Sequence, residues 1–135
     1  MGNFFSKKGV VAFFFSPLLC SFVSCSDVSP EQQAAESAKA YYDFLVEGDA
    51  VRFLENKAGV DTLSADYGDQ LLAAVRQYQE DIQKKHGGLR EVRIADDQST
   101  FSILQQSTLI LCYTDSTQEA IAVPMVERDG EWLMK

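Results

Sequence analysis

Few residues of this 135-residue chain could do chemistry, since it holds one histidine and three cysteines. His86 follows Lys84 and Lys85 at the end of a helical pattern, where a solvated cap at the negative end of the helix dipole is the favoured interpretation. A metal site built on one histidine without a neighbouring cysteine is short of soft ligands. Cys112 lies inside the apolar run 109–113, which offers no electropositive neighbour, so we expect a small buried hydrophobe there and not a nucleophile.

A search for known catalytic and cofactor-binding motifs leads to the same conclusion. The sequence contains no phosphate-cradling glycine loop, no nucleophile elbow and no paired-carboxylate motif. We therefore expect neither a metal nor another cofactor.

Residues 1–24 have the pattern of a secretory signal peptide, with two lysines before an apolar stretch over 9–23. Those fifteen residues are too few to span a bilayer, for which a helix needs about 20. Ser24 before Cys25 resembles a bacterial lipobox, in which the chain is cleaved before the cysteine and the thiol carries a diacylglyceryl group. Cys20 is the weaker candidate because a bulky residue precedes it. Ordinary secretion with cleavage nearby and an uncleaved segment are the alternatives.

The composition predicts one folded domain behind this leader, with a tether over 25–29 and the domain over 30–135. Apolar residues make up 46% of the chain and aromatic residues 11%, which is enough for a packed core. From Cys25 on, 20 acidic residues face 10 basic ones, because no acid precedes Asp27 and two lysines belong to the leader. Such a chain repels phosphate backbones, which excludes nucleic acid as a partner. We expect attachment through Cys25 to a cell-envelope bilayer of a Gram-negative bacterium, on its periplasmic or its surface side.

Three helices are predicted in the first half of the domain. Ser29 and Pro30 indicate the start of the first helix and Gly48 its end, Asp49 caps a short second helix, and Ser64 caps a long third helix. We expect the apolar stripe of the third helix to face a core. The apolar positions of the three helices are Ala34, Ala38, Tyr41, Tyr42 and Leu45; Val51, Phe53 and Leu54; and Tyr67, Leu71, Val75, Tyr78 and Ile82.

After residue 88 the apolar period changes to two, which predicts strands. The expected strands cover about 89–95, 100–113 with a bulge near 105–107, 120–127 and the residues after a type I′ turn at Asp129-Gly130. Pro124 cannot donate a ladder hydrogen bond, so we expect an open side or a bulge there. Three helices followed by four antiparallel strands predict an α+β domain with the helices on one face of a meander.

Four short sequence segments follow one another along the chain, at residues 41–49, 63–67, 86–88 and 129–132. In this order they are similar to small bacterial lipoproteins of unknown function in the nuclear-transport-factor-2-like (NTF2-like) superfamily, which have a lumazine-binding-like fold. The resemblance covers about 30–135. It implies three helices packed on a curved four-stranded antiparallel sheet that wraps the first helix into a cone.

The resemblance also implies where a reaction would take place. Enzymes of this superfamily put a carboxylate or a Tyr–Asp pair inside the cone, so the candidates here are Asp43, Asp66 with Tyr67, and Tyr113. Each has a simpler interpretation: Asp43 as an exposed helix residue, Asp66 as an acid favoured in a first helical turn, and the tyrosines as core residues with a polar tip. We therefore expect that the protein is not an enzyme.

A binding role requires fewer specific residues than catalysis does. A cone mouth lined by Tyr42, Phe53, Met125 and Trp132 could hold an apolar or aromatic small molecule, or a peptide of a partner protein. A purely structural lipoprotein, whose cone is filled by its own side chains, is an equal alternative, and an enzyme with a buried carboxylate or tyrosine is the third.

Overall fold

The computed structural model describes residues 28–135, so the expected leader and Cys25 lie outside the described residues. Helix α1 (Pro30–Val46) begins where the sequence predicts, because the Ser29 hydroxyl accepts a hydrogen bond from the Gln32 amide at 3.2 Å. Gly48 follows its end with a φ of 83°, a left-handed conformation that glycine adopts without strain.

The next helices also start at predicted caps. Asp49 caps α2 (Ala50–Glu55), the short 3₁₀ helix η3 (Val60–Thr62) follows, and Ser64 caps α3 (Ala65–His86). Of the apolar positions of α2, Phe53 packs against the core, whereas Val51 is 45% exposed.

Four strands form one antiparallel sheet in the order β2-β3-β4-β5, which confirms the predicted α+β class. They are β2 (Leu89–Ile94), β3 (Gln106–Tyr113), β4 (Gln118–Arg128) and β5 (Glu131–Met134). Asp129 and Gly130 have φ values of 53° and 81°, as the predicted type I′ turn requires. β4 pairs with β3 through Pro124 and with β5 from Met125 on, so the proline lies where β4 changes its neighbour.

The predicted long strand over 100–113 is wrong in its first part. Residues Thr100–Leu104 form a short helix, α4, and Gln105 ends it in a left-handed conformation with a φ of 53°. The pairing of β3 with β4 then runs without a bulge, and the irregularity in the sheet lies instead in β2, between Leu89 and Glu91. α4 turns Phe101 toward the core and leaves Ile103 82% exposed.

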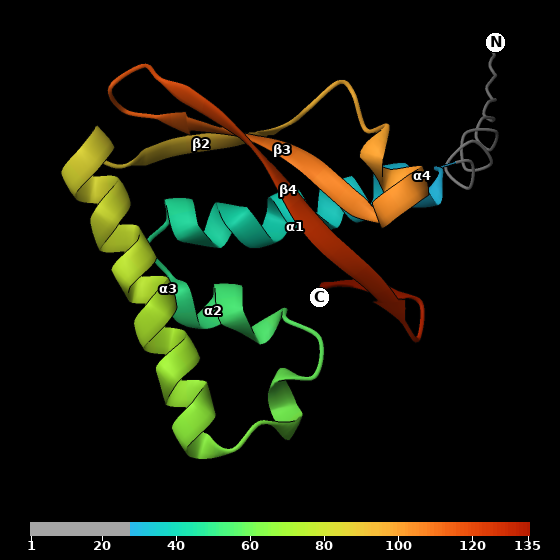
Figure 1. Ribbon diagram of the computed structural model, residues 1–135, viewed down its shortest axis with the longest axis horizontal. Helices are drawn as coiled ribbons and strands as arrows, with labels where there is room; N and C mark the ends of the chain where they lie inside the picture. The colour runs from blue at the N-terminus through green and yellow to red at the C-terminus, as the bar shows by residue number, and fades with distance from the viewer. Residues whose placement is uncertain (1–27) are drawn as a thin grey trace, which may run out of the picture.

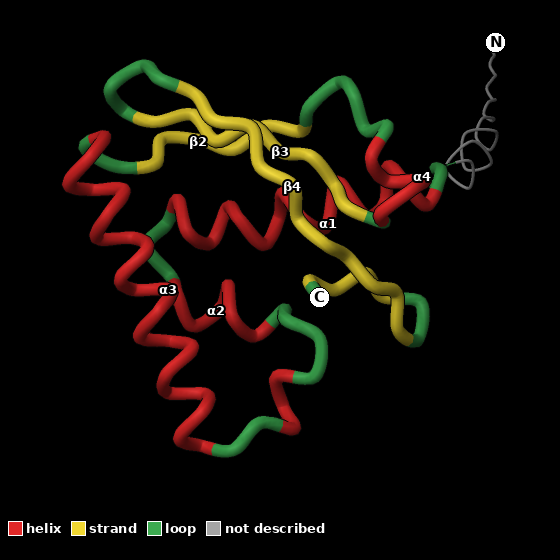
Figure 2. The backbone as a smooth tube through the Cα atoms, viewed as in Figure 1, coloured by secondary structure: helices red, strands yellow, loops and turns green. Residues whose placement is uncertain are grey.

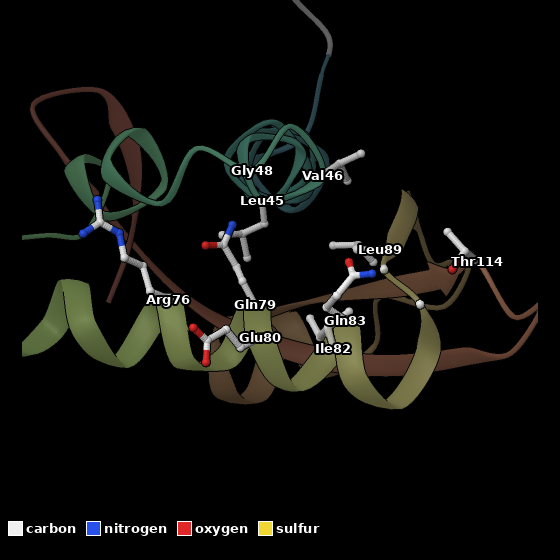
Figure 3. Close-up of a pocket in the computed structure, with 12 residues that line it drawn as sticks. Leu45, Val46, Gly48, Arg76, Gln79, Glu80, Ile82, Gln83, Leu89 and Thr114 are labelled. Atoms are coloured by element: carbon white, nitrogen blue, oxygen red, sulfur yellow. The ribbon is translucent and has the colours of Figure 1, made fainter.

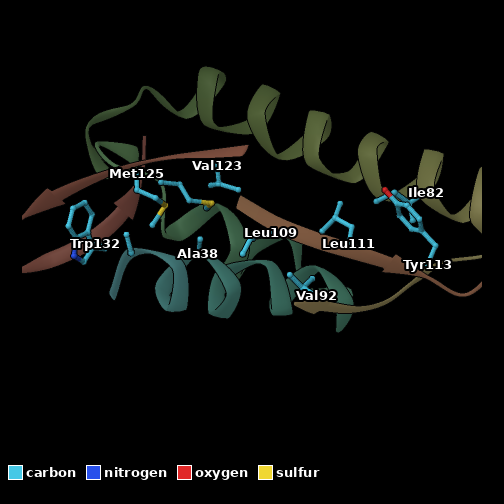
Figure 4. Close-up of a cluster of buried hydrophobic side chains, with 11 residues drawn as sticks. Ala38, Ile82, Val92, Leu109, Leu111, Tyr113, Val123, Met125 and Trp132 are labelled. Atoms are coloured by element: carbon cyan, nitrogen blue, oxygen red, sulfur yellow. The ribbon is translucent and has the colours of Figure 1, made fainter. Parts of the chain in front are cut away.

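The sheet curls around α1, which contacts β2, β3 and β5 (Figure 1). Figure 2 shows β4 bending along its length, so the sheet and α1 form the cone that the fold class implies. A core of eleven side chains fills the space between α1 and the sheet, from Trp132 at one end to Tyr113 and Ile82 at the other (Figure 4).

Helix α3 stands at a steep angle to α1 along one side of the molecule (Figure 1). It contacts α2 and, near its end, β2. Only Ile82 of its predicted stripe is buried, while Tyr67 is 50% and Tyr78 38% exposed, so the expectation that the whole stripe faces the core is wrong. The helix diverges from the sheet toward its N-terminal end, and the stripe there is left open.

All eleven core residues lie between Ala34 and Met134. We therefore expect the chain from Ser26 on to fold without the residues before it, with a mixed α/β circular dichroism spectrum and one cooperative thermal transition. An aggregated or molten product would contradict the domain boundary. Within residues 28–135, every helix is too short or too polar to cross a bilayer.

Candidate functional site: an apolar groove beside the core

An open groove of about 340 Å³ lies where α3 diverges from the sheet. We call it the apolar groove. Its walls come from α1, α2, α3, β4 and β5, and the residues that line it are Tyr42, Phe53, Leu54, Lys57, Leu71, Ala74, Val75, Tyr78, Val123, Pro124, Met134 and Lys135. The open part of the α3 stripe, which the sequence alone would bury, supplies one whole wall.

Two aromatic side chains that line the apolar groove, those of Tyr42 and Phe53, pack against each other. The rings of Tyr42 and Phe53 meet edge to face, with centroids 5.0 Å apart and an interplanar angle of 84°. Burial, and then the neighbouring Tyr78, raise the pKa of Tyr42 to about 12. Burial, and then Glu119, also raise the pKa of Tyr78. Both hydroxyl groups therefore keep their protons at neutral pH and offer uncharged hydrogen-bonding tips.

The structure brings together only two of the four pocket residues proposed from sequence. Tyr42 and Phe53 line the apolar groove, whereas Met125 and Trp132 are buried in the core, with exposed fractions of 2% and 7%. Trp132 packs against Phe101 with ring centroids 5.6 Å apart. The alternation of β5 does turn Trp132 to the concave face, but the core fills that part of the cone.

A second groove of about 650 Å³ lies between the end of α1 and the second half of α3 (Figure 3). Its lining mixes apolar groups such as Leu45 and Leu89 with charged and amide side chains, Arg76, Glu80 and Gln83 among them. Such a mixture offers no contiguous apolar wall, so we place the candidate binding site in the apolar groove.

His86 is more than the solvated cap expected from sequence. Its ring stacks on the Tyr113 ring with centroids 3.9 Å apart, and its Nδ1 lies 2.8 Å from a carboxylate oxygen of Asp115. The Tyr113 hydroxyl donates to Glu119 at 2.6 Å, and burial, followed by this bond, raises the pKa of Tyr113. The cluster joins the end of α3 to the turn between β3 and β4. No sequence signal pointed to it, because residues 86 and 115 meet only in the folded chain.

This cluster predicts a pH dependence of stability. Hydrogen bonds from Thr117 and then from His86 hold the pKa of Asp115 at about 2, below its usual 3.8. A carboxyl whose pKa is depressed by folding stabilises the fold above its usual pKa, and that contribution is lost as the pH falls toward 2. Asp115→Asn should therefore lower the melting temperature at neutral pH, and the difference from wild type should shrink between about pH 4 and pH 2. A difference that stays constant over this range would contradict the assignment.

The catalytic candidates proposed from sequence lie outside the two grooves. Asp43 is half-buried and forms an ion pair with Lys39 at 2.8 Å in a shallow hollow between α1 and β2. Asp66 and Tyr67 are exposed in the first turn of α3. None of these three residues, nor Tyr113, lines either groove. Within residues 28–135, no three His, Cys, Asp or Glu side chains gather as a metal site would require.

Comparisons with known proteins bear on the fold. No protein-family model matches the chain, and no curated protein matches it. A crystal structure from Campylobacter jejuni, described as a candidate NTF2-like transpeptidase, superposes with a TM-score of 0.56 at 14% identity, over 73% of this chain and 94% of the other. At this identity the likeness concerns the fold alone. The chain thus has the NTF2-like fold, as the sequence resemblance predicted, and its place among small lipoproteins of that superfamily stays a prediction.

Proposed function

We propose that this protein is a lipid-anchored cell-envelope protein that binds a small apolar molecule in the apolar groove and catalyses no reaction. The observation that carries the proposal is the groove itself, an open space of about 340 Å³ between α2, α3 and the end of the sheet. Ligand sites are concave, mostly apolar and upward of about 300 Å³, with a few polar groups that orient the ligand. The hydroxyl groups of Tyr42 and Tyr78 supply such groups here.

The anchor half of the proposal rests on the sequence. Lipid on Cys25 would leave a tether of five residues before α1 begins at Pro30. A tether of that length spans at most about 18 Å, so the domain would stay close to the bilayer surface, within reach of molecules that partition into the membrane.

An enzyme is the competing proposal, because the Campylobacter jejuni protein is described as a candidate transpeptidase. Group transfer of that kind commonly uses an activated nucleophile within reach of a base. Cys112, the cysteine of the described residues, is completely buried in the sheet. The carboxylates Asp43 and Asp66 lie outside both grooves. These placements favour binding over catalysis.

Two neighbouring alanines of α3 provide the test. Ala74 lines the apolar groove, whereas Ala73 does not, and both are exposed. Ala74→Phe should fill the groove and weaken the binding of N-phenylnaphthylamine, a neutral fluorescent probe, by about tenfold, equivalent to about 1.4 kcal/mol. Ala73→Phe, with the same change in helix propensity, should bind as wild type does.

The fluorescence titration is made on the chain from Ser26 on, whose core is complete. A wild-type chain that does not bind the probe would favour the structural lipoprotein with a filled cone. Equal loss of binding in Ala73→Phe and Ala74→Phe would place the site elsewhere.

A further inference from the structure

The charged side chains that line the apolar groove have one sign. Of the residues that line it, Lys57 and Lys135 are charged, and no Asp or Glu of the described residues is among them. This is the reverse of the sequence from Cys25 on, in which 20 acidic residues face 10 basic ones. A cationic end on an otherwise apolar groove favours a ligand of the opposite charge.

The backbone fixes the position of Lys57. This residue follows α2 and forms an isolated bridge with Met134 of β5. The Ala58 amide donates to the Met134 carbonyl at 2.7 Å, and the Met134 amide donates to the Asn56 carbonyl at 3.0 Å. These bonds on both sides of Lys57 hold its backbone at the end of the sheet, so its side chain starts from a preorganised place.

The Lys57 ammonium has more N–H donors than the one hydrogen bond that it makes. It donates to the main-chain oxygen of Lys135 at 3.0 Å. An ammonium carries three N–H donors, which leaves two for a ligand. The side chain is half-buried at the rim of the groove, where water screens a charge less than on an open surface.

The two tyrosine hydroxyl groups of the groove add no negative charge. The pKa values of Tyr42 and Tyr78 are raised, chiefly by burial, so both hydroxyls are neutral at physiological pH. A ligand thus meets apolar walls, two uncharged hydroxyls and a cation at one end.

We propose that the ligand of the apolar groove is an anionic amphiphile: an apolar chain or ring in the groove and a carboxylate head paired with Lys57. This inference rests on the proposed function, because it names the ligand class of the same groove. A carboxylate is a compact anion that an ammonium at the rim can bind by charge-assisted hydrogen bonds. An apolar body supplies the affinity, and the head fixes its direction.

The experiment compares two ligands that share a chain and differ in charge. Decanoate and decanol are each used to displace N-phenylnaphthylamine from the chain from Ser26 on. We expect decanoate to compete about fivefold better than decanol, as a partly exposed ion pair allows, and expect this preference to fall as salt is added. Lys57→Gln should remove the preference and leave decanol binding unchanged.

Two control variants keep the test decisive. Lys57→Arg keeps the charge and should keep the preference, and Lys84→Gln removes a lysine that does not line the groove and should also keep it. Equal competition by the two ligands in wild type would overturn this inference and leave the proposed function standing. A preference that survives in Lys57→Gln would overturn it as well. Failure of the neutral probe to bind at all would reject the proposed function, and this inference with it.

Discussion

Trp132→Ala should lower the free energy of unfolding by about 3–5 kcal/mol, a large share of the 5–15 kcal/mol that stabilises a typical domain. The side chain is 7% exposed at one end of the core and packs edge-on against Phe101. The Tyr41 hydroxyl donates to the backbone carbonyl of Trp132, a bond that the substitution leaves in place. The indole N–H has no hydrogen-bond partner among the described residues, so the cost comes from lost packing and the cavity left behind.

Unfolding by denaturant measures this cost. It is followed by tryptophan fluorescence in wild type and by circular dichroism in Trp132→Ala, which has no tryptophan. Trp132 is the single tryptophan of the chain, so the native emission should be blue-shifted and should redden on unfolding. Ile103→Ala is the matched control: this residue is 82% exposed on α4 and its truncation should change stability by less than about 0.5 kcal/mol. A red native emission that soluble quenchers reach would contradict the burial of Trp132 and the placement of β5 on the cone.

Cys25→Ser should move the protein from the detergent phase to the aqueous phase in a cell fractionation. The expected effect is close to all or none, because the thiol of Cys25 is the proposed site of the lipid and serine cannot carry a thioether-linked diacylglyceryl group. Cys20→Ser is the control, since the bulky Leu19 before it makes Cys20 the weaker lipidation candidate. The described residues hold no helix suited to span a bilayer in place of the lipid.

Two outcomes of this fractionation would count against the anchor. If Cys25→Ser stays in the detergent phase, the membrane attachment comes from elsewhere. If Cys20→Ser leaves that phase and Cys25→Ser does not, the lipid belongs to Cys20 and the tether is five residues longer than proposed here.

Local signals in the sequence predicted most of the secondary structure. Ser29, Ser64 and the Asp129-Gly130 turn act through hydrogen bonds and φ values of the residues around them, so no distant contact is needed to recognise them. The segment 100–104 could not be assigned in this way. A short apolar run fits a strand or a helix equally, and the contact of Phe101 with Trp132, 31 residues away, accompanies the helical choice.

The candidate site was only half predictable, for a related reason. Periodicity places Tyr42 and Phe53 on apolar helix faces, and it places Leu71 and Val75 on such a face too. It does not tell which face is covered by a neighbour. Because α3 diverges from the sheet, Leu71 and Val75 of its apolar stripe line the groove. Trp132, in contrast, is buried in the core.

Methyl NMR spectroscopy of the chain from Ser26 on, titrated with N-phenylnaphthylamine, would show directly whether a small apolar molecule binds in the apolar groove. We expect the shifts to concentrate on methyl groups that line the apolar groove, namely those of Leu54, Leu71, Val75, Val123 and Met134. The methyl groups of Ile103 and Leu104, which are more exposed but lie on α4, should not move. Shifts that concentrate on Ile103 and Leu104, or that are absent from the groove residues at saturating probe, would contradict binding in the apolar groove.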